Sequence, residues 1–459
     1  MGANVVDEGA RQASHTAPPT WVADLVLYEL NPRTFTSPNG IGDGGGSGTF
    51  ASLRERLPYL AELGVNGIWM AGHSLATSHF YGVWSAYAAD RPDIVDPHLG
   101  TRDDLYDLVA AAHVLGIRIF LDVISHGVVS TSTLVTDHPD WFDGGTWGMA
   151  DYDYRNPDFR RWWVDLWVGY VRDFDVDGYR VDVSLIDPTV WEIIARQCIE
   201  HGKPIAVFPE NGRYHFGQQE VHGPAVDPVL DWAIAREFTG HRFTLRQLSS
   251  HDRGWEALPG NHYVARGSRA KLGYGLLLNP QIPLFFAGEE FDADPIPLPG
   301  LTRSLYGGGG PGGWLYGCRL DWSQLEQPAK RAVLSDVVSY LKARRKYCHL
   351  LNADTAAATM LRAPGDGAAP LVPYIRYIPG REAILIVGND LQREVTFRIQ
   401  LPLEQLGFDA TKNVRATDVL DGTNWTCSVA ELHELLVTVG AAYEPGGGVR
   451  ALHFESASA

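Results

Sequence analysis

From residue 21 onward, short apolar segments of strand length alternate with longer segments that have helical periodicity. Eight apolar segments follow this pattern: "LVLYEL" (25–30), "GIWMAG" (67–72), "IRIFLDVI" (117–124), "GYRVDV" (178–183), "IAVFPE" (205–210), "VLDWAI" (229–234), "TLRQLS" (244–249) and "IPLFFAG" (282–288). Strands that are apolar almost throughout are typical of a parallel sheet with helices on its faces. Eight such units predict an α/β fold in which the sheet closes into a (β/α)₈ barrel, or TIM barrel.

An open, doubly wound parallel sheet is the alternative architecture for the same alternation of strands and helices. Such sheets bind dinucleotides at a G-x-G-x-x-G turn that follows a strand, and no predicted strand here is followed by that turn. The glycine runs "GDGGGSG" (42–48) and "YGGGGPGGW" (306–314) also lack the Gly-Lys-Ser/Thr ending of a phosphate-binding loop. We therefore favour the barrel and interpret both runs as flexible loops.

Changes in composition along the chain divide it into regions. Residues 1–20 have no pattern that would form a core, and we expect a disordered tail there. Residues 21–354 carry the barrel, with a short inserted loop region after the third strand, residues 127–157, that is rich in Asp, Trp and Tyr. Residues 355–459 contain short alternating segments separated by Gly, Asn, Asp and Pro, which predict a C-terminal antiparallel β-sandwich domain.

The charge balance and the cysteines indicate which binding partners are excluded and in which compartment the protein is expected. The formal net charge is −17, so the chain lacks the basic surface that nucleic-acid binding requires. No apolar run reaches the roughly 18 residues of a membrane span, and the N-terminus has no apolar signal segment. The four cysteines form no Cys-x-x-Cys pair, which indicates free thiols in a reducing compartment. We therefore expect a cytoplasmic protein, and its oligomeric state stays open.

The segment "GYRVDV" places two charged residues on one face of an otherwise apolar strand. Burying Arg180 and Asp182 as a pair is costly, which suggests a functional role for them, and the arginine would keep the aspartate ionised. Further ionisable residues at predicted strand ends are Asp122, His126, Glu210, His251 and Asp252. One such residue could simply cap the following helix. Their recurrence at the C-terminal ends of four strands, where barrels build their active sites, predicts a shared pocket.

With these strand ends the chain resembles the α-amylase family of retaining glycoside hydrolases (family 13), over nearly its whole length. The segments that carry the resemblance are, in order, "SAYAADRPDIVDPHLGT" (85–101), "FLDVISH" (120–126), "MADYD" (149–153), "GYRVDV" (178–183), "VFPEN" (207–211), "LSSHD" (248–252) and "IPLFFAGEEF" (282–291). Each segment alone is a weak signal, whereas their order and spacing together are highly specific.

The resemblance implies a role for each of these residues. Asp182 would be the nucleophile, Glu210 the general acid/base and Asp252 the stabiliser of the transition state. A retaining enzyme needs one carboxylate that attacks the anomeric carbon and a second carboxyl group that protonates the leaving oxygen. The residues that would bind the substrate sugar are Tyr87, Asp122, His126, Arg180 and His251.

The activity that the resemblance implies is hydrolysis of α-glucosidic bonds in an α-glucan or in short α-gluco-oligosaccharides, through a covalent glycosyl-enzyme. The alternative is a transglycosylase of the same family, which transfers a glucosyl unit to an acceptor other than water. A non-catalytic carbohydrate-binding barrel is a third reading, and the intact set of three carboxylic acids argues against it. The sequence leaves open the choice between the first two, the linkage, and endo or exo attack.

The chain departs from the family pattern at several positions around the predicted pocket. Ser125 stands where the family usually has an asparagine that helps to bind calcium, and the neighbouring insertion is short. We therefore expect no metal and no cofactor. Ala88 replaces the aspartate that usually follows Tyr87, and Leu185 and Ile186 make the leaving-group side less polar.

A second candidate for the last carboxylate motif occurs in "GNHYVAR" (260–266). Asn261 and His262 fit that motif, but Tyr263 stands where it requires an aspartate. The segment "SSHD" ends a predicted strand and keeps the carboxylate, so we assign the stabilising role to Asp252.

Overall fold

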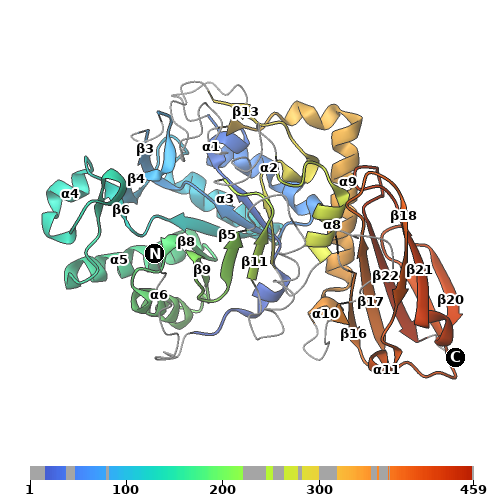
Figure 1. Ribbon diagram of the computed structural model, residues 1–459. Helices are drawn as coiled ribbons and strands as arrows, with labels where there is room; N and C mark the ends of the chain where they lie inside the picture. The colour runs from blue at the N-terminus through green and yellow to red at the C-terminus, as the bar shows by residue number, and fades with distance from the viewer. Residues whose placement is uncertain are drawn as a thin grey trace, which may run out of the picture.

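The structure is a computed structural model, which describes residues 16–37, 47–78, 82–220, 244–251, 263–277, 282–298, 318–352, 359–360, 371 and 373–456 of the 459-residue chain. A barrel of parallel strands forms the larger part, and antiparallel strands form a C-terminal part on one side of it (Figure 1). The helices α8 (Arg269–Leu277) and α9 (Pro328–Lys346) lie along the boundary between the two parts.

Eight parallel strands form the barrel, and each pairs with its neighbour in one continuous order. They are β1 (Leu27–Leu30), β2 (Gly67–Met70), β5 (Arg118–Val123), β8 (Gly178–Ser184), β9 (Ala206–Asn211), β10 (Gly217–Glu220), β11 (Thr244–Gln247) and β12 (Ile282–Phe286). The order is β10-β11-β12-β1-β2-β5-β8-β9. Its two ends, β9 and β10, are consecutive in the chain and contact each other, which closes the sheet. The predicted (β/α)₈ barrel is therefore confirmed.

The interior of the barrel is filled by apolar side chains. Leu27, Trp69, Phe120, Phe208 and Leu284 come from different strands and belong to one buried cluster. The rings of Trp69 and Phe208 lie edge to face with their centroids 6.0 Å apart. Because the interior is packed, polar chemistry is restricted to the ends of the strands, as in other barrels of this type.

The main connecting helices of the barrel are α2 (Phe50–Leu63), α3 (Arg102–Val114), α5 (Pro157–Phe174) and α6 (Pro188–Glu200). Each begins at a residue whose side chain accepts a hydrogen bond from the backbone of the first turn. Thr49 and Thr101 cap α2 and α3, and Asn156 and Asp187 cap α5 and α6 in front of a proline. These caps fix where each helix begins after its strand.

Short elements extend the rim of the barrel after β2 and β5. β3 (Ser74–Thr77) pairs antiparallel with β4 (Ser85–Val95). In the predicted insertion, β6 (Gly127–Val129) pairs antiparallel with β7 (Met149–Asp151), with α4 (Thr133–Asp137) between them. Figure 1 shows α4 and β6 at the end of the molecule that lies away from the C-terminal strands.

The C-terminal part contains two antiparallel sheets that share a core. The larger sheet has the order β15 (Thr359–Met360), β16 (Tyr374–Ile378), β17 (Glu382–Gly388), β22 (Val449–Ser456), β19 (Asn413–Asp418) and β20 (Asn424–Ser428). The smaller sheet pairs β18 (Val395–Gln400) with β21 (Glu434–Val439). Leu385 of the larger sheet and Phe397 and Val437 of the smaller one belong to one buried cluster. This is the antiparallel C-terminal domain that the sequence predicts.

Two sequence predictions differ from the structure. The strand next to β9 is residues 217–220, where we expected 229–234, a segment that lies outside the described residues. The tetrapeptide "GQQE" has no apolar alternation, so its pairing is not evident from the sequence. Residues 16–20, which we expected in the disordered tail, are ordered. The backbone N–H of Thr16 donates to Glu192 Oε2 (3.1 Å), which anchors this segment on α6.

Two further findings concern the helices and the cysteines. None of the helices in the described part of the chain is both long and apolar enough to cross a membrane. Cys198, Cys318, Cys348 and Cys427 are all free thiols, and the first two are buried. The predicted absence of a disulfide framework therefore agrees with the structure.

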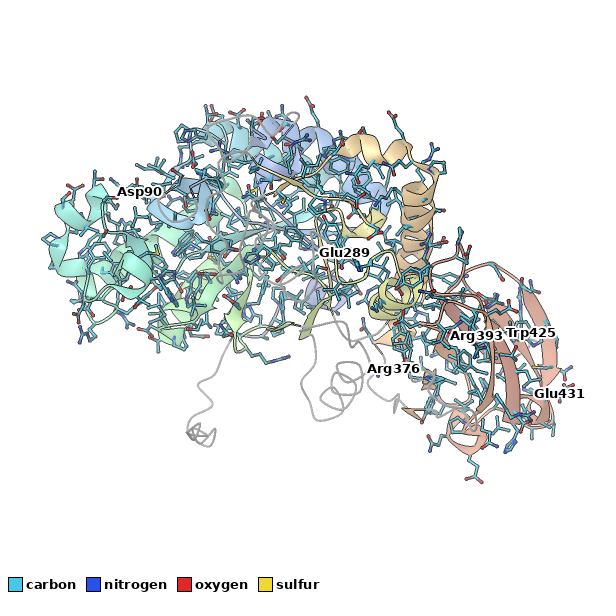
Figure 2. All side chains as sticks on the ribbon, turned by 45° about the horizontal axis from the view of Figure 1, so that its top comes forward. Asp90, Glu289, Arg376, Arg393, Trp425 and Glu431 are labelled. Carbon is cyan, nitrogen blue, oxygen red and sulfur yellow. The ribbon has the colours of Figure 1, made fainter. Side chains whose placement is uncertain are left out.

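Two adjacent carboxylic acids are buried just after β12. Glu290 Oε1 accepts hydrogen bonds from the hydroxyls of Tyr28 (3.0 Å) and Tyr59 (2.6 Å), and Glu289 Oε1 accepts one from Ser249 (2.7 Å). Glu289 lies deep among the side chains of the barrel part (Figure 2). Burial raises the pKa of Glu289 to about 8 and that of Glu290 to about 7, and hydrogen bonds only partly oppose it.

The raised pKa of Glu289 predicts how the free energy of unfolding changes with pH. Its pKa is higher in the folded protein, so its contribution to stability is lost as the pH rises from about 4.5 through about 8. Glu289→Gln keeps an acceptor for Ser249 but cannot ionise. Between about pH 5 and pH 9 the variant should gain stability relative to wild type by on the order of 4 kcal/mol, measured by urea unfolding. The exposed Glu444→Gln is the control, and parallel pH profiles of Glu289→Gln and wild type would contradict this assignment.

Candidate active site

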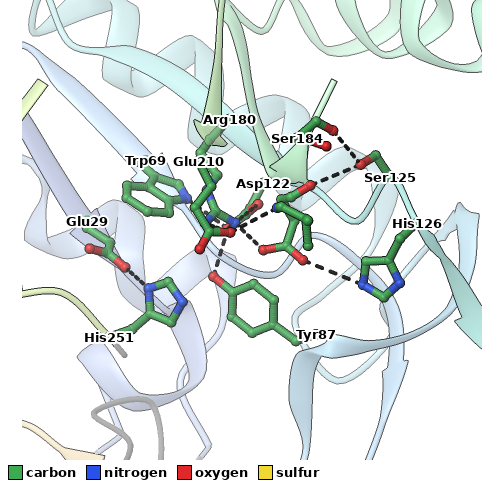
Figure 3. Close-up of polar contacts among 12 residues, drawn as sticks. Glu29, Trp69, Tyr87, Asp122, Ser125, His126, Arg180, Ser184, Glu210 and His251 are labelled. Carbon is green, nitrogen blue, oxygen red and sulfur yellow. Dashed lines mark hydrogen bonds and ion pairs between the residues drawn. The ribbon is translucent and has the colours of Figure 1, made fainter. Parts of the chain in front are cut away.

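The ends of three adjacent barrel strands bring charged side chains together at one rim (Figure 3). Asp122 belongs to β5, Arg180 and Asp182 belong to β8, and Glu210 belongs to β9. In the parallel register Asp122 pairs with Arg180, so that neighbouring strands present these residues at the same height. The structure therefore brings together four of the residues that the sequence places in one pocket.

Arg180 is the centre of this group, and only 1% of its side chain is exposed. Its Nη1 donates to Asp182 Oδ1 (2.5 Å) and to Asp122 Oδ1 (3.0 Å), and its Nη2 lies 2.9 Å from Glu210 Oε2. The guanidinium carbon also lies over the ring of Trp69, 4.8 Å from the centroid. One forked, always charged group thus fixes three carboxylates, a geometry that a lysine ammonium could not reproduce.

The pKa values of Asp122 and Asp182 shift in opposite directions, although both side chains contact Arg180. Burial raises the pKa of Asp122 to about 6, and Arg180 opposes this only in part. Burial acts on Asp182 in the same direction, but Arg180 and His126 outweigh it and lower the pKa of Asp182 to about 2. Asp182 is therefore held as a carboxylate.

Two residues at the exit of β5 lie against Asp182. His126 Nε2 is 3.6 Å from Asp182 Oδ2. The hydroxyl of Ser125 donates to the backbone carbonyls of Asp182 (3.0 Å) and Ser184 (3.1 Å). Ser125 thus ties the end of β8 to the end of β5.

The backbone next to Asp182 is strained. Val183 has a φ of 62°, a region that β-branched residues adopt very rarely. Its N–H donates to Glu210 Oε2 (2.9 Å), and its carbonyl accepts from Asn211 Nδ2 (2.8 Å). The strained residue therefore holds the end of β9, and with it Glu210, beside Asp182. The sequence gives no signal for this role, because valine ordinarily favours extended backbone.

His251 lies at the opposite side of this group of side chains from His126 (Figure 3). Its Nδ1 is 2.5 Å from Oε1 of Glu29, a fully buried residue of β1. Its ring stacks on that of Tyr87, with centroids 4.9 Å apart and planes 11° from parallel. The Tyr87 hydroxyl donates to Asp122 Oδ2 (2.9 Å), so the tyrosine is held in place although Ala88 replaces the usual aspartate.

Two further residues, which were not predicted from the sequence, belong to this site. Trp69 Nε1 donates to Asp122 Oδ2 (2.9 Å), and Glu29 contacts His251 as described above. The sequence does contain a signal for Glu29, since it is the one acidic residue in the apolar segment 25–30. Trp69 has no such signal, because an aromatic residue in a buried strand is ordinarily part of the core.

The predicted stabiliser, Asp252, lies outside the described residues, as do Asn261 and His262 of the competing motif. Tyr263 of that motif is 1% exposed, and its hydroxyl donates to the carbonyl of Ala287 (2.6 Å). It is therefore a core residue. The assignment of Asp252 stays a prediction.

Within the described ranges, no group of three or more His, Cys, Asp or Glu side chains lies close enough to hold a metal ion. In the insertion, Asp153 Oδ1 accepts from Arg155 Nε (2.7 Å), and Asp151 accepts from the backbone N–H of Thr146 (2.9 Å). The expected absence of a metal and of a cofactor stays a prediction.

Comparison with known proteins finds similarity to α-amylases over part of the chain. The family model described as the alpha amylase catalytic domain matches residues 30–144. The chain is 27% identical over 277 residues to an intracellular maltogenic amylase of Bacillus subtilis, and the match covers 50% of this chain and 46% of that protein. Over these parts of its length the chain is similar to the α-amylase family. It spans about half the length of the curated relatives that it matches.

Solved structures of the α-amylase family share the fold. A maltogenic α-amylase from Thermotoga neapolitana is 19% identical with a TM-score of 0.68, over 94% of this chain and 98% of that chain. An α-amylase from Geobacillus thermoleovorans, complexed with acarbose, is 16% identical with a TM-score of 0.70, over 96% of this chain and 100% of that chain. At these identities the likeness establishes the fold: a TIM barrel followed by an antiparallel C-terminal domain.

Proposed function

We propose that this protein is a retaining glycoside hydrolase that cleaves α-glucosidic bonds in short α-gluco-oligosaccharides. The observation that carries the proposal is the pairing of two carboxyl groups on one guanidinium: Arg180 lies 2.5 Å from Asp182 Oδ1 and 2.9 Å from Glu210 Oε2. Adjacent parallel strands lie about 4.8 Å apart, which suits the roughly 5–5.5 Å between the carboxyl groups of retaining enzymes. An inverting enzyme needs about 6.5–9.5 Å, to leave room for the attacking water.

In the first step Asp182 attacks the anomeric carbon, and the bond from that carbon to the leaving oxygen breaks. Glu210 donates its proton to the leaving oxygen. Arg180 supports this step because it keeps Asp182 ionised until the attack. For this step Glu210 must carry a proton. Its carboxyl group must also contact the glycosidic oxygen in place of Arg180. The product is a β-linked ester between the sugar and Asp182.

In the second step a water molecule occupies the place of the leaving group. Glu210 takes a proton from this water while the water oxygen attacks the anomeric carbon. The ester bond to Asp182 breaks, and the sugar leaves with the α configuration. Two inversions give net retention.

The remaining pocket residues would bind the sugar that Asp182 attacks. Tyr87 offers an aromatic face, and Asp122, His126 and His251 offer hydrogen-bonding groups around it. Asp252 would be the third carboxylate, which grips sugar hydroxyls more strongly in the transition state. The printed names of the relatives, maltogenic amylase and an α-amylase bound to acarbose, support α-gluco-oligosaccharides as the substrate class. We also propose a cytoplasmic location, which the name of the Bacillus relative and the four free cysteines support.

The test is a panel of maltooligosaccharides, isomaltose, trehalose, sucrose and starch, with products followed over time. NMR should show that the α-anomer of the released reducing end forms first and that the β-anomer appears later by mutarotation. A β-anomer as the first product would overturn the retaining assignment. Early products longer than the substrate would favour the transglycosylase, and binding without any turnover would favour a carbohydrate-binding barrel.

A further inference from the structure

Trp147, in the insertion, is an exposed tryptophan that contacts His126 of the candidate site. It lies in the turn η3 (Thr146–Gly148), which directly precedes β7, and it is 64% exposed. Its ring contacts His126 edge to face, with centroids 5.0 Å apart and planes at 81°. An indole that is exposed over most of its surface and touches an active-site histidine has the character of a binding surface.

The backbone holds Trp147 in an unfavourable conformation. Its φ is 54° and its ψ is 22°, in the left-handed region that non-glycine residues rarely adopt. The preceding residue, Thr146, is fixed by the Asp151 carboxylate, which accepts from its backbone N–H (2.9 Å) and from its hydroxyl (2.6 Å). Strain that the surrounding structure maintains concentrates at ligand-binding and catalytic positions. Trp147 is therefore presented in one orientation before any ligand arrives, which lowers the entropic cost of binding.

The contacts of His126 indicate on which side of the reacting sugar Trp147 lies. His126, which Trp147 contacts, has its Nε2 3.6 Å from Asp182 Oδ2. The other oxygen of Asp182, Oδ1, binds Arg180, which also contacts Glu210. Figure 3 shows His126 at one edge of the cluster, with Glu210 and Arg180 between it and Trp69. In the proposed reaction Glu210 protonates the leaving oxygen and so marks the leaving-group side. Its contact with His126 therefore puts Trp147 next to the Oδ2 side of Asp182, while Glu210 is joined to the Oδ1 side through Arg180. In the proposed reaction, sugars on the non-reducing side of the reacting glucose extend away from Glu210.

We propose that Trp147 is the stacking platform for a second glucosyl residue, bound on the non-reducing side of the residue that Asp182 attacks. This inference rests on the proposed function. The apolar face of the second sugar ring packs on the indole, while its hydroxyls remain in contact with water. Trp147 is then a specificity-determining residue, which makes the enzyme prefer donors with at least two glucosyl units.

Two substrates with the same leaving group isolate this contact: p-nitrophenyl α-glucoside, with one glucosyl unit, and p-nitrophenyl α-maltoside, with two. The value of kcat/KM for release of p-nitrophenol is measured for both. Trp147→Ala should lower the value for the maltoside by about tenfold, the size expected for loss of one aromatic contact, and leave the value for the glucoside within about twofold. Trp147→Phe should restore most of the loss. The exposed Tyr106→Ala, on α3, is the matched control and should change neither value.

Equal effects of Trp147→Ala on both substrates would overturn the inference while leaving the proposed function intact. Cleavage of the maltoside only between its two glucose units would also overturn it, because no second donor sugar would then be bound. If wild type cleaves no α-glucoside, the proposed function itself has failed. Calorimetric titration of wild type and Trp147→Ala with maltotriose then tests the platform alone: a tenfold weaker affinity of the variant supports it, and equal affinity overturns it.

Discussion

Asp182→Asn is expected to reduce cleavage of every α-glucoside to background, because the carboxylate that forms the covalent intermediate is gone. Glu210→Gln is expected to behave differently. It should lose about 10²–10⁴-fold in kcat on oligosaccharides, whose leaving oxygen needs a proton. It should lose far less in the first step with p-nitrophenyl α-glucoside, whose leaving group departs without protonation. Burst kinetics on the aryl substrate would show this first step directly.

The matched control for both variants is Asp165→Asn, which removes an exposed carboxylate of α5 and should leave turnover unchanged. Melting temperatures of all three variants separate loss of chemistry from loss of fold. Full activity of Asp182→Asn would exclude this residue as the nucleophile. Equal losses of Glu210→Gln on the oligosaccharide and in the burst with the aryl substrate would exclude Glu210 as the general acid.

Arg180→Met is expected to lower the free energy of unfolding by about 3–5 kcal/mol at neutral pH, the range for removing one partner of a buried ion pair. The substitution keeps much of the side-chain volume but leaves Asp122, Asp182 and Glu210 close together without their shared cation. Urea unfolding near pH 7 measures the effect. Arg180→Lys should recover only part of the loss, because one ammonium cannot reproduce the forked contacts.

The pH dependence of this loss follows from the shifted pKa values. The pKa of Asp182 is lowered to about 2 in the folded protein, so its pairing with Arg180 stabilises the fold above the unfolded value, 3.8, and is lost as the pH falls through about 2. The gap in stability between wild type and Arg180→Met should therefore be largest near neutral pH and shrink in acid. Adding Asp122→Asn to Arg180→Met should restore stability, since it removes one of the uncompensated charges. A gap that is small at neutral pH would mean that Arg180 does not hold the carboxylates together.

Much of the barrel could be predicted from local patterns. Apolar strands such as 67–72 and 117–124 and the periodic helices between them fix the layers, because burial on both faces requires apolar runs. The strand at 217–220 could not be predicted in this way. Its four residues carry no apolar pattern, and it is a strand because β11 pairs with it. Pairing between segments that are distant in sequence is decided by the closed sheet and not by local propensity.

By itself, the sequence determined which ionisable residues stand at strand ends, and parallel pairing then had to bring Asp122, Arg180, Asp182 and Glu210 to one rim. Only the tertiary structure decided what each of them touches. Packing decides that Arg180 contacts three carboxyl groups and that the strained Val183 binds Glu210. It also decides that the ring of Trp147 contacts His126. Such contacts join strands and loops far apart in the chain. Their distances depend on the twist and closure of the whole barrel, which no local segment encodes.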